Sequence, residues 1–188
     1  MAKRFAKQAA AMAIALLSLN SMAHEQNNGC TTATLKGTYG VKIHAQALGI
    51  LTGTAPNQIL HPYAAPIVID GVALQTFDGA GGGNQQDFVM ANGTRTPGAP
   101  SGFEPNEMLS YTVNPDCTGE LRITIPSGAM IAEKFVVVDN GNEMFGVTSA
   151  QHLAGGPPAE GALCNMGCDV AIQESSHHTR VGKARDEH

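Results

Sequence analysis

The chain has 188 residues and a formal net charge of -5; 14% of its residues are charged and 43% are hydrophobic. This length suits a single domain, and the low charged fraction excludes a coiled coil and a charged, disordered chain. The acidic balance argues against nucleic-acid binding, which requires a basic face to neutralise phosphates.

Residues 1–23 have the three parts of a secretory signal peptide. Three basic residues precede an apolar run over 9–19, and small side chains at Ser21 and Ala23 mark a cleavage site. The run is too short to cross a bilayer, which disfavours a membrane anchor. We therefore expect a secreted or periplasmic protein that is cleaved near Ala23 and has no stable membrane anchor.

All four cysteines follow this segment. In an oxidising compartment, an even number of cysteines favours disulfides. Of the three possible connectivities, we favour the one with the bonds Cys30–Cys117 and Cys164–Cys168. The first bond would tie the N-terminal segment to the body of the protein, and the second would close a small loop.

A zinc site is the alternative use of two of these cysteines. It would combine Cys164 and Cys168 with His177 and His178. Two adjacent histidines cannot easily face one ion, and structural zinc sites space their histidines further apart. We therefore expect disulfides, with no metal ion and no cofactor.

Alternating apolar and polar residues predict β-strands through the rest of the chain, and no stretch carries a convincing helix. The first strand covers 35–48, where Tyr39, Val41 and Ile43 share one face. Polar residues such as His44 share the other face and are expected in solvent. Seven further strands are predicted over 67–77, 85–91, 107–113, 120–125, 132–139, 142–149 and 169–175.

Eight strands in sequence predict an all-β fold. Because several are joined by tight turns such as Asn140-Gly141, we expect a single antiparallel up-and-down barrel over 35–175. Such a barrel has room inside for one small ligand, and a two-sheet sandwich is the alternative. We expect a flexible lead-in over 24–34 and a frayed polar tail over 176–188. Long loops that can cover a cavity are predicted over 49–66, 92–106 and 150–167.

Four blocks of sequence carry a family resemblance: LKGTYG at 35–40, TFDG at 76–79, YTVNPDCTG at 111–119 and VDNGNE at 138–143. In this order they resemble a group of exported bacterial proteins that are similar to the allene oxide cyclase barrel. The resemblance implies a small calycin-like barrel of eight strands with a hydrophobic cavity. The plant cyclases guide ring closure of a fatty-acid epoxide largely by cavity shape. The blocks are turn and strand signatures, so the resemblance assigns no catalytic residue.

The apolar strand faces favour binding of a small hydrophobic molecule. Neither a phosphate-cradling loop nor a Gly-x-Ser-x-Gly nucleophile motif is present, so no catalytic motif competes with this interpretation. In a small barrel, the residues that form the core also form the cavity wall. The predicted ligand-binding residues are Tyr39, Val41, Ile43, Phe77, Tyr111, Ile123, Phe135 and Phe145.

Two carboxylates are candidates for catalysis. Glu133 alternates in phase with Phe135, and Glu143 with Phe145, so both acids enter the barrel if the phenylalanines face inward. A carboxylate in an apolar cavity has a raised pKa and can act as a general acid or base, here in an isomerase or cyclase. The alternative is that both lie in water at strand ends, since Glu is rarely buried. A third possibility is a structural or surface-interaction module whose barrel is filled by side chains.

Overall fold

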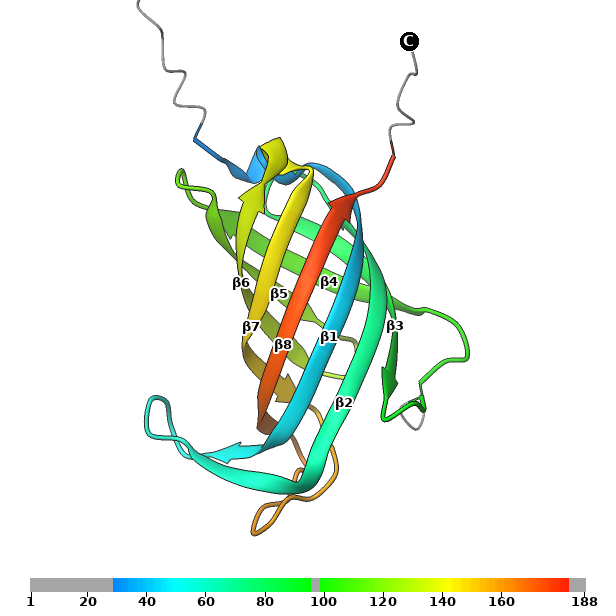
Figure 1. The fold of residues 1–188 in the computed structure, drawn as a ribbon, viewed down its shortest axis with the longest axis vertical. Coiled ribbons are helices and arrows are strands. Elements are labelled where there is room, and N and C mark those ends of the chain that lie inside the picture. Colours follow the sequence, from blue (N-terminus) through cyan, green and yellow to red (C-terminus); the bar gives the residue numbers. More distant parts are fainter. Residues whose placement is uncertain (1–28, 96–98, 183–188) are drawn as a thin grey trace, which may run out of the picture.

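The structure is a computed structural model that describes residues 29–95 and 99–182, so the predicted signal peptide over 1–23 lies outside the described residues. Eight antiparallel strands follow one another and close into a single barrel, with β8 hydrogen-bonded to β1 (Figure 1). The predicted all-β, eight-stranded antiparallel topology is confirmed. The strands are β1 (Gly37–Thr52), β2 (Ile59–Phe77), β3 (Gly82–Ala91), β4 (Glu104–Val113), β5 (Thr118–Thr124), β6 (Met130–Val138), β7 (Glu143–Leu153) and β8 (Cys168–Arg180).

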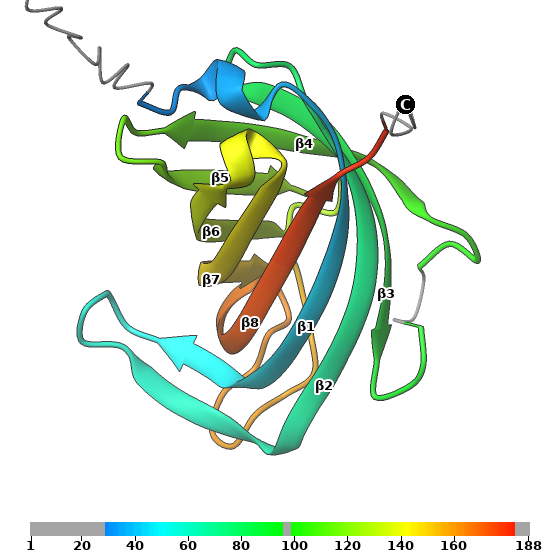
Figure 2. The same cartoon turned by 45° about the horizontal axis from the view of Figure 1, so that its top comes forward.

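Two short 3-10 helices, η1 (Thr32–Leu35) and η2 (Asp139–Gly141), lie at the same end of the barrel (Figure 2). Arg180, the last residue of β8, joins them: its guanidinium donates to the carbonyls of Thr34 at 2.9 Å and Gly141 at 2.7 Å. The connections β1–β2, β3–β4 and β7–β8 lie at the opposite end (Figure 1), which we call the loop end. In the described residues, no helix is long and apolar enough to cross a membrane.

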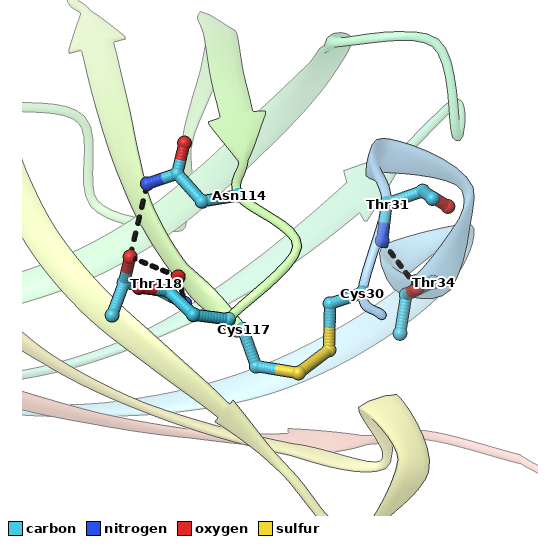
Figure 3. The surroundings of a disulfide bond; sticks show 7 residues. Cys30, Thr31, Thr34, Asn114, Cys117 and Thr118 are labelled. Atoms are coloured by element: carbon cyan, nitrogen blue, oxygen red, sulfur yellow. Dashed lines mark hydrogen bonds between the residues drawn. A yellow bond between two sulfur atoms is a disulfide. The ribbon is translucent and has the colours of Figure 1, made fainter. Parts of the chain in front are cut away.

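Both predicted disulfides, Cys30–Cys117 and Cys164–Cys168, are present. The first links the segment before η1 to the β4–β5 turn (Figure 3), and the backbone N–H of Cys30 also donates to the Pro115 carbonyl at 3.2 Å. The expectation of a flexible lead-in is therefore wrong for residues 29–34, which are anchored across the end of the barrel.

The first two strands extend further toward the loop end than their alternation predicted. β1 and β2 pair as far as Thr52 and Ile59, so six residues, 53–58, remain of the long loop expected over 49–66. A register shift between Ala47 and Gly49 interrupts the period of two and hides the continuation.

The C-terminal strand also runs further than expected. β8 continues to Arg180 and pairs with both β1 and β7, so the predicted frayed tail is wrong for residues 176–180. This stretch is polar in sequence, yet Ser176 and His178 point into the barrel and are buried.

An apolar cluster fills the barrel beneath η1. The rings of Tyr39 and Phe77, and of Phe77 and Tyr111, pack edge to face with centroids 5.4 Å and 4.9 Å apart. Leu35 of η1 is completely buried on this cluster, so this end is closed. A second, smaller cluster at the loop end contains the Cys164–Cys168 disulfide and Tyr63.

Candidate ligand-binding site

A cavity of about 320 Å³ lies inside the barrel, on the loop-end side of the apolar cluster. This volume is at the lower end of the range of roughly 300–1,000 Å³ that small-molecule sites occupy. Larger depressions of about 510 and 780 Å³ lie elsewhere, on the outer surface of the barrel. The walls of the interior cavity are largely aliphatic and include Val41, Ile43, Ile67, Ile69, Val89, Val170 and Ile172. Gly155, Gly156 and Pro157 of the β7–β8 connection also line it.

The eight predicted ligand-binding residues divide into three groups. Val41, Ile43 and Ile123 line the cavity. The aromatic residues Tyr39, Phe77, Tyr111 and Phe135 are buried in the apolar cluster and do not line it. They fill the closed end of the barrel, and the cavity begins on the loop-end side of them.

The sequence alternation predicted the wrong face of the strand for Phe145, the eighth residue. It is 46% exposed on the outside of the barrel and stacks on His177, with ring centroids 4.7 Å apart. Its neighbours Met144 and Gly146 face inward. A Cβ at Gly146 would lie 2.5 Å from the Ser176 hydroxyl oxygen, so only glycine fits on this inner face.

The two candidate catalytic acids, Glu133 and Glu143, lie on different sides of the barrel wall. Glu133 is 4% exposed and lines the cavity. Glu143 lies on the outer face of β7, where its carboxylate is 3.5 Å from His177 Nε2. The expectation that Glu143 enters the cavity is therefore wrong, because Glu143 and Phe145 lie on the same face of β7 and that face points to solvent.

Buried polar residues, most of them missed in the sequence, surround the deep end of the cavity. Glu107 is 1% exposed and Glu174 is 9% exposed, and both line the cavity together with Asp87 and Glu104. The signal was present in the alternation: Glu107 is in phase with Leu109 and Tyr111. Hydrophobicity alone hides it, since Glu is expected at the surface.

A chain of amides connects Glu107 to the opposite wall. The Gln75 side-chain N–H donates to the Gln85 oxygen at 2.6 Å, and the Gln85 side-chain N–H donates to the Glu107 carboxylate. The Gln75 oxygen lies 3.0 Å from His178 Nδ1. Because a carbonyl oxygen only accepts, His178 carries a proton on Nδ1.

His178 in turn reaches Glu133. Its Nε2 lies 2.8 Å from the Ser176 hydroxyl oxygen and 3.7 Å from Glu133 Oε2, and the Ser176 hydroxyl donates to the same carboxylate at 3.4 Å. Among the carboxylates lining the cavity in the described part of the chain, only Glu133 has a basic side chain within 4.0 Å.

Burial raises the pKa of three of the other carboxyl groups. The pKa of Glu107 rises to about 8, with the charge of Asp87 adding to the effect of burial. That of Glu174 rises to about 7, because burial, helped by the charge of Glu133, outweighs the lowering effect of the Thr148 hydroxyl. That of Asp87 rises to about 6, through burial and the charge of Glu104. The cavity therefore holds carboxyl groups that exchange protons near neutral pH.

The alternative zinc site is not formed. Cys164 and Cys168 are joined in a disulfide, His177 lies on the outer surface and His178 lies inside the barrel. Within residues 29–95 and 99–182, no group of three or more His, Cys, Asp or Glu side chains is arranged to hold a metal ion. His44 is exposed on the outer face, as its alternation predicted.

No protein-family model, no curated protein and no solved structure matches this chain. The function is therefore argued from the cavity and its lining.

Proposed function

We propose that this protein is an exported β-barrel that binds a small, largely apolar molecule in its interior. The observation that carries this proposal is the aliphatic cavity of about 320 Å³. A purely structural module would gain stability by filling this space with side chains, since an unfilled cavity is destabilising. The resemblance to allene oxide cyclase-like, calycin-like barrels supports the same class of function.

The two ends of the barrel differ in a way that suits a binding protein. One end is plugged by η1 and tied down by the Cys30–Cys117 disulfide. The other end is bordered by chain connections, with Gly155, Gly156 and Pro157 against the cavity. A ligand would thus enter from the loop end. The disulfides and the predicted signal peptide support export to the periplasm or the medium.

A fluorescence titration tests the proposal. N-phenylnaphthylamine, a compact apolar dye, should bind the oxidised protein with one-to-one stoichiometry. Val89→Trp would fill the cavity and should weaken binding at least tenfold, whereas Val147→Trp, on the outer face, should leave it unchanged. Circular dichroism checks that both variants fold. Equal binding by the two variants would place the dye outside the barrel and contradict the proposal.

The contacts of Glu133 favour a second candidate, an isomerase or cyclase. This carboxylate lines the cavity and is held by Ser176 and His178, which suits a group that moves a proton. Nitrobenzisoxazole is a compact probe: a base removes its ring C–H proton, the N–O bond breaks and a coloured nitrile phenolate forms. Catalysed ring opening that Glu133→Gln abolishes and Glu143→Gln retains would support this candidate. A rate equal to that of buffer would contradict it.

A further inference from the structure

We infer that the ligand carries a basic nitrogen: the site takes a lipophilic amine, with its ammonium group in the acidic part of the cavity that Glu107 and Glu174 line and its apolar part against the aliphatic wall. This inference rests on the proposed function and specifies the chemical class of the ligand.

Glu174 is a buried carboxyl group with only one weak neighbouring donor. It is 91% buried and lines the cavity. The Thr148 hydroxyl on β7 lies beside it and lowers its pKa, but this hydroxyl oxygen is buried and makes no hydrogen bond of regular geometry. Burying a charged carboxylate with so little support is costly, so a donor supplied from within the cavity would stabilise this group.

Glu107 offers a second acceptor on the opposite wall. Its Oε2 accepts from Gln85, and its Oε1 has no donor among the described residues. The side chain is 99% buried and lines the same cavity as Glu174. An ammonium group has three N–H bonds to donate, so it can bind one of these carboxyl groups and further acceptors around it.

The cavity carries an excess of carboxyl groups, which become negative as pH rises toward 8. Its lining includes five carboxyl groups, those of Asp87, Glu104, Glu107, Glu133 and Glu174. Arg95 is the one Lys or Arg residue in that lining.

Most of the Arg95 guanidinium is engaged by neighbouring groups, although its Nε is buried without a hydrogen bond. Its guanidinium donates to the carbonyls of Val89 at 2.8 Å and Pro100 at 2.9 Å, and lies over the Phe88 ring at 4.2 Å. It makes no ion pair within 4.0 Å in the described part of the chain. The excess of carboxylates opposes an anionic ligand and favours a cation.

The polarity of the cavity changes along its length. Going inward from the loop end along β8, the inward-facing side chains are Val170 and Ile172, then Glu174, then Ser176 and His178. An amine that enters with its charged group first would therefore reach the carboxylates and leave its hydrocarbon in the aliphatic part. The volume of about 320 Å³ corresponds to about ten water molecules, which leaves room for the eight-carbon probes used below.

Three probes with the same hydrocarbon chain test the inference: octylamine, octanol and octanoate, each titrated against the oxidised protein by displacement of N-phenylnaphthylamine. At pH 8, octylamine should bind at least tenfold more tightly than octanol, and octanoate more weakly than either. Glu107→Gln and Glu174→Gln should each reduce octylamine affinity at least tenfold and leave octanol affinity unchanged. Glu143→Gln, which alters a carboxylate on the outer face, is the matched control.

The pH dependence provides a readout that does not depend on variants. Octylamine should bind more tightly as pH rises from 5 to 8, because the amine stays protonated while Glu107, Glu174 and Asp87 ionise. Tyr63, Glu104, Glu133, His178 and Arg95 are the other charged or titratable groups around the site. Octanol affinity should stay flat over this range.

The outcomes separate the two proposals. If octanol binds inside the barrel as tightly as octylamine, or if octylamine affinity does not rise with pH, the inference about the amine is overturned while the proposed function stands. If none of the three probes displaces the dye and the dye itself does not bind, both are overturned.

Discussion

Replacing Glu107 by Gln should reduce the loss of stability that this protein shows as pH rises from 5 to 8. Glu107 is 1% exposed, and burial raises its pKa from 4.5 to about 8. Gln has nearly the same shape, and its carbonyl oxygen can still accept the hydrogen bond from Gln85. The substitution therefore removes the ionisation and keeps the packing.

The magnitude follows from the difference between the two pKa values. Between pH 4.5 and 8 the folded protein retains a proton on Glu107 that the unfolded chain has released, so stability falls as pH rises through this interval. At about 1.4 kcal/mol per pKa unit, Glu107 lowers the free energy of unfolding by up to about 3–4 kcal/mol between pH 5 and pH 8. This is an upper limit, because water and small rearrangements screen a buried charge.

Urea denaturation at pH 5, 6, 7 and 8 measures the effect. The wild type should lose stability across this range, and Glu107→Gln should lose markedly less and be the more stable protein at pH 8. Glu143→Gln, on the outer surface, should follow the wild type. Parallel pH profiles for Glu107→Gln and the wild type would refute the assignment of Glu107 as a buried acid with a raised pKa.

Three further substitutions test the frame of the site by urea denaturation. Gly146→Ala should destabilise the fold by about 1–3 kcal/mol through overpacking. The control Gly40→Ala, with no atom within 4 Å of the new Cβ, should cost less than about 0.5 kcal/mol. Equal losses of stability in the two variants would contradict the close packing around Gly146. Replacing Cys30 and Cys117 together by Ser should lower stability by about 2–4 kcal/mol, because the bond closes a long loop; no loss would show that η1 is held without it. Arg180→Ala should cost about 2 kcal/mol, since its charged hydrogen bonds join η1 to η2, and an unchanged unfolding midpoint would contradict that role.

The sequence was sufficient to predict the order of the strands and both disulfides. Each strand has enough alternation to be recognised, and turn sequences such as Asn114–Gly119 separate them. The strand ends were harder to predict. The bulge after Ala47 breaks the alternation, and the end of β8 pairs on both sides although its residues are polar.

The polar half of the candidate site was hidden for a physical reason. Hydrophobic patterning assigns Glu, Gln and His to the surface, yet Glu107, Gln75 and His178 face inward and are buried through hydrogen bonds between different strands. Those partners are 10 and 103 residues apart in the chain, so no local pattern reveals them. On β7, both sets of alternate residues contain apolar side chains, so hydrophobicity does not show which set faces inward. The close approach of Gly146 to Ser176 places the set that includes Gly146 inside the barrel.

The most direct test of ligand binding inside the barrel is a crystal structure of the oxidised protein grown with bromooctane. This probe is neutral, so its position does not depend on the inference about the amine. We predict one bromooctane molecule within the barrel, with the anomalous signal of its bromine among the aliphatic side chains that include Val41, Ile69 and Ile172. Bromine found only on the outer surface, with the interior filled by rearranged side chains, would contradict the account.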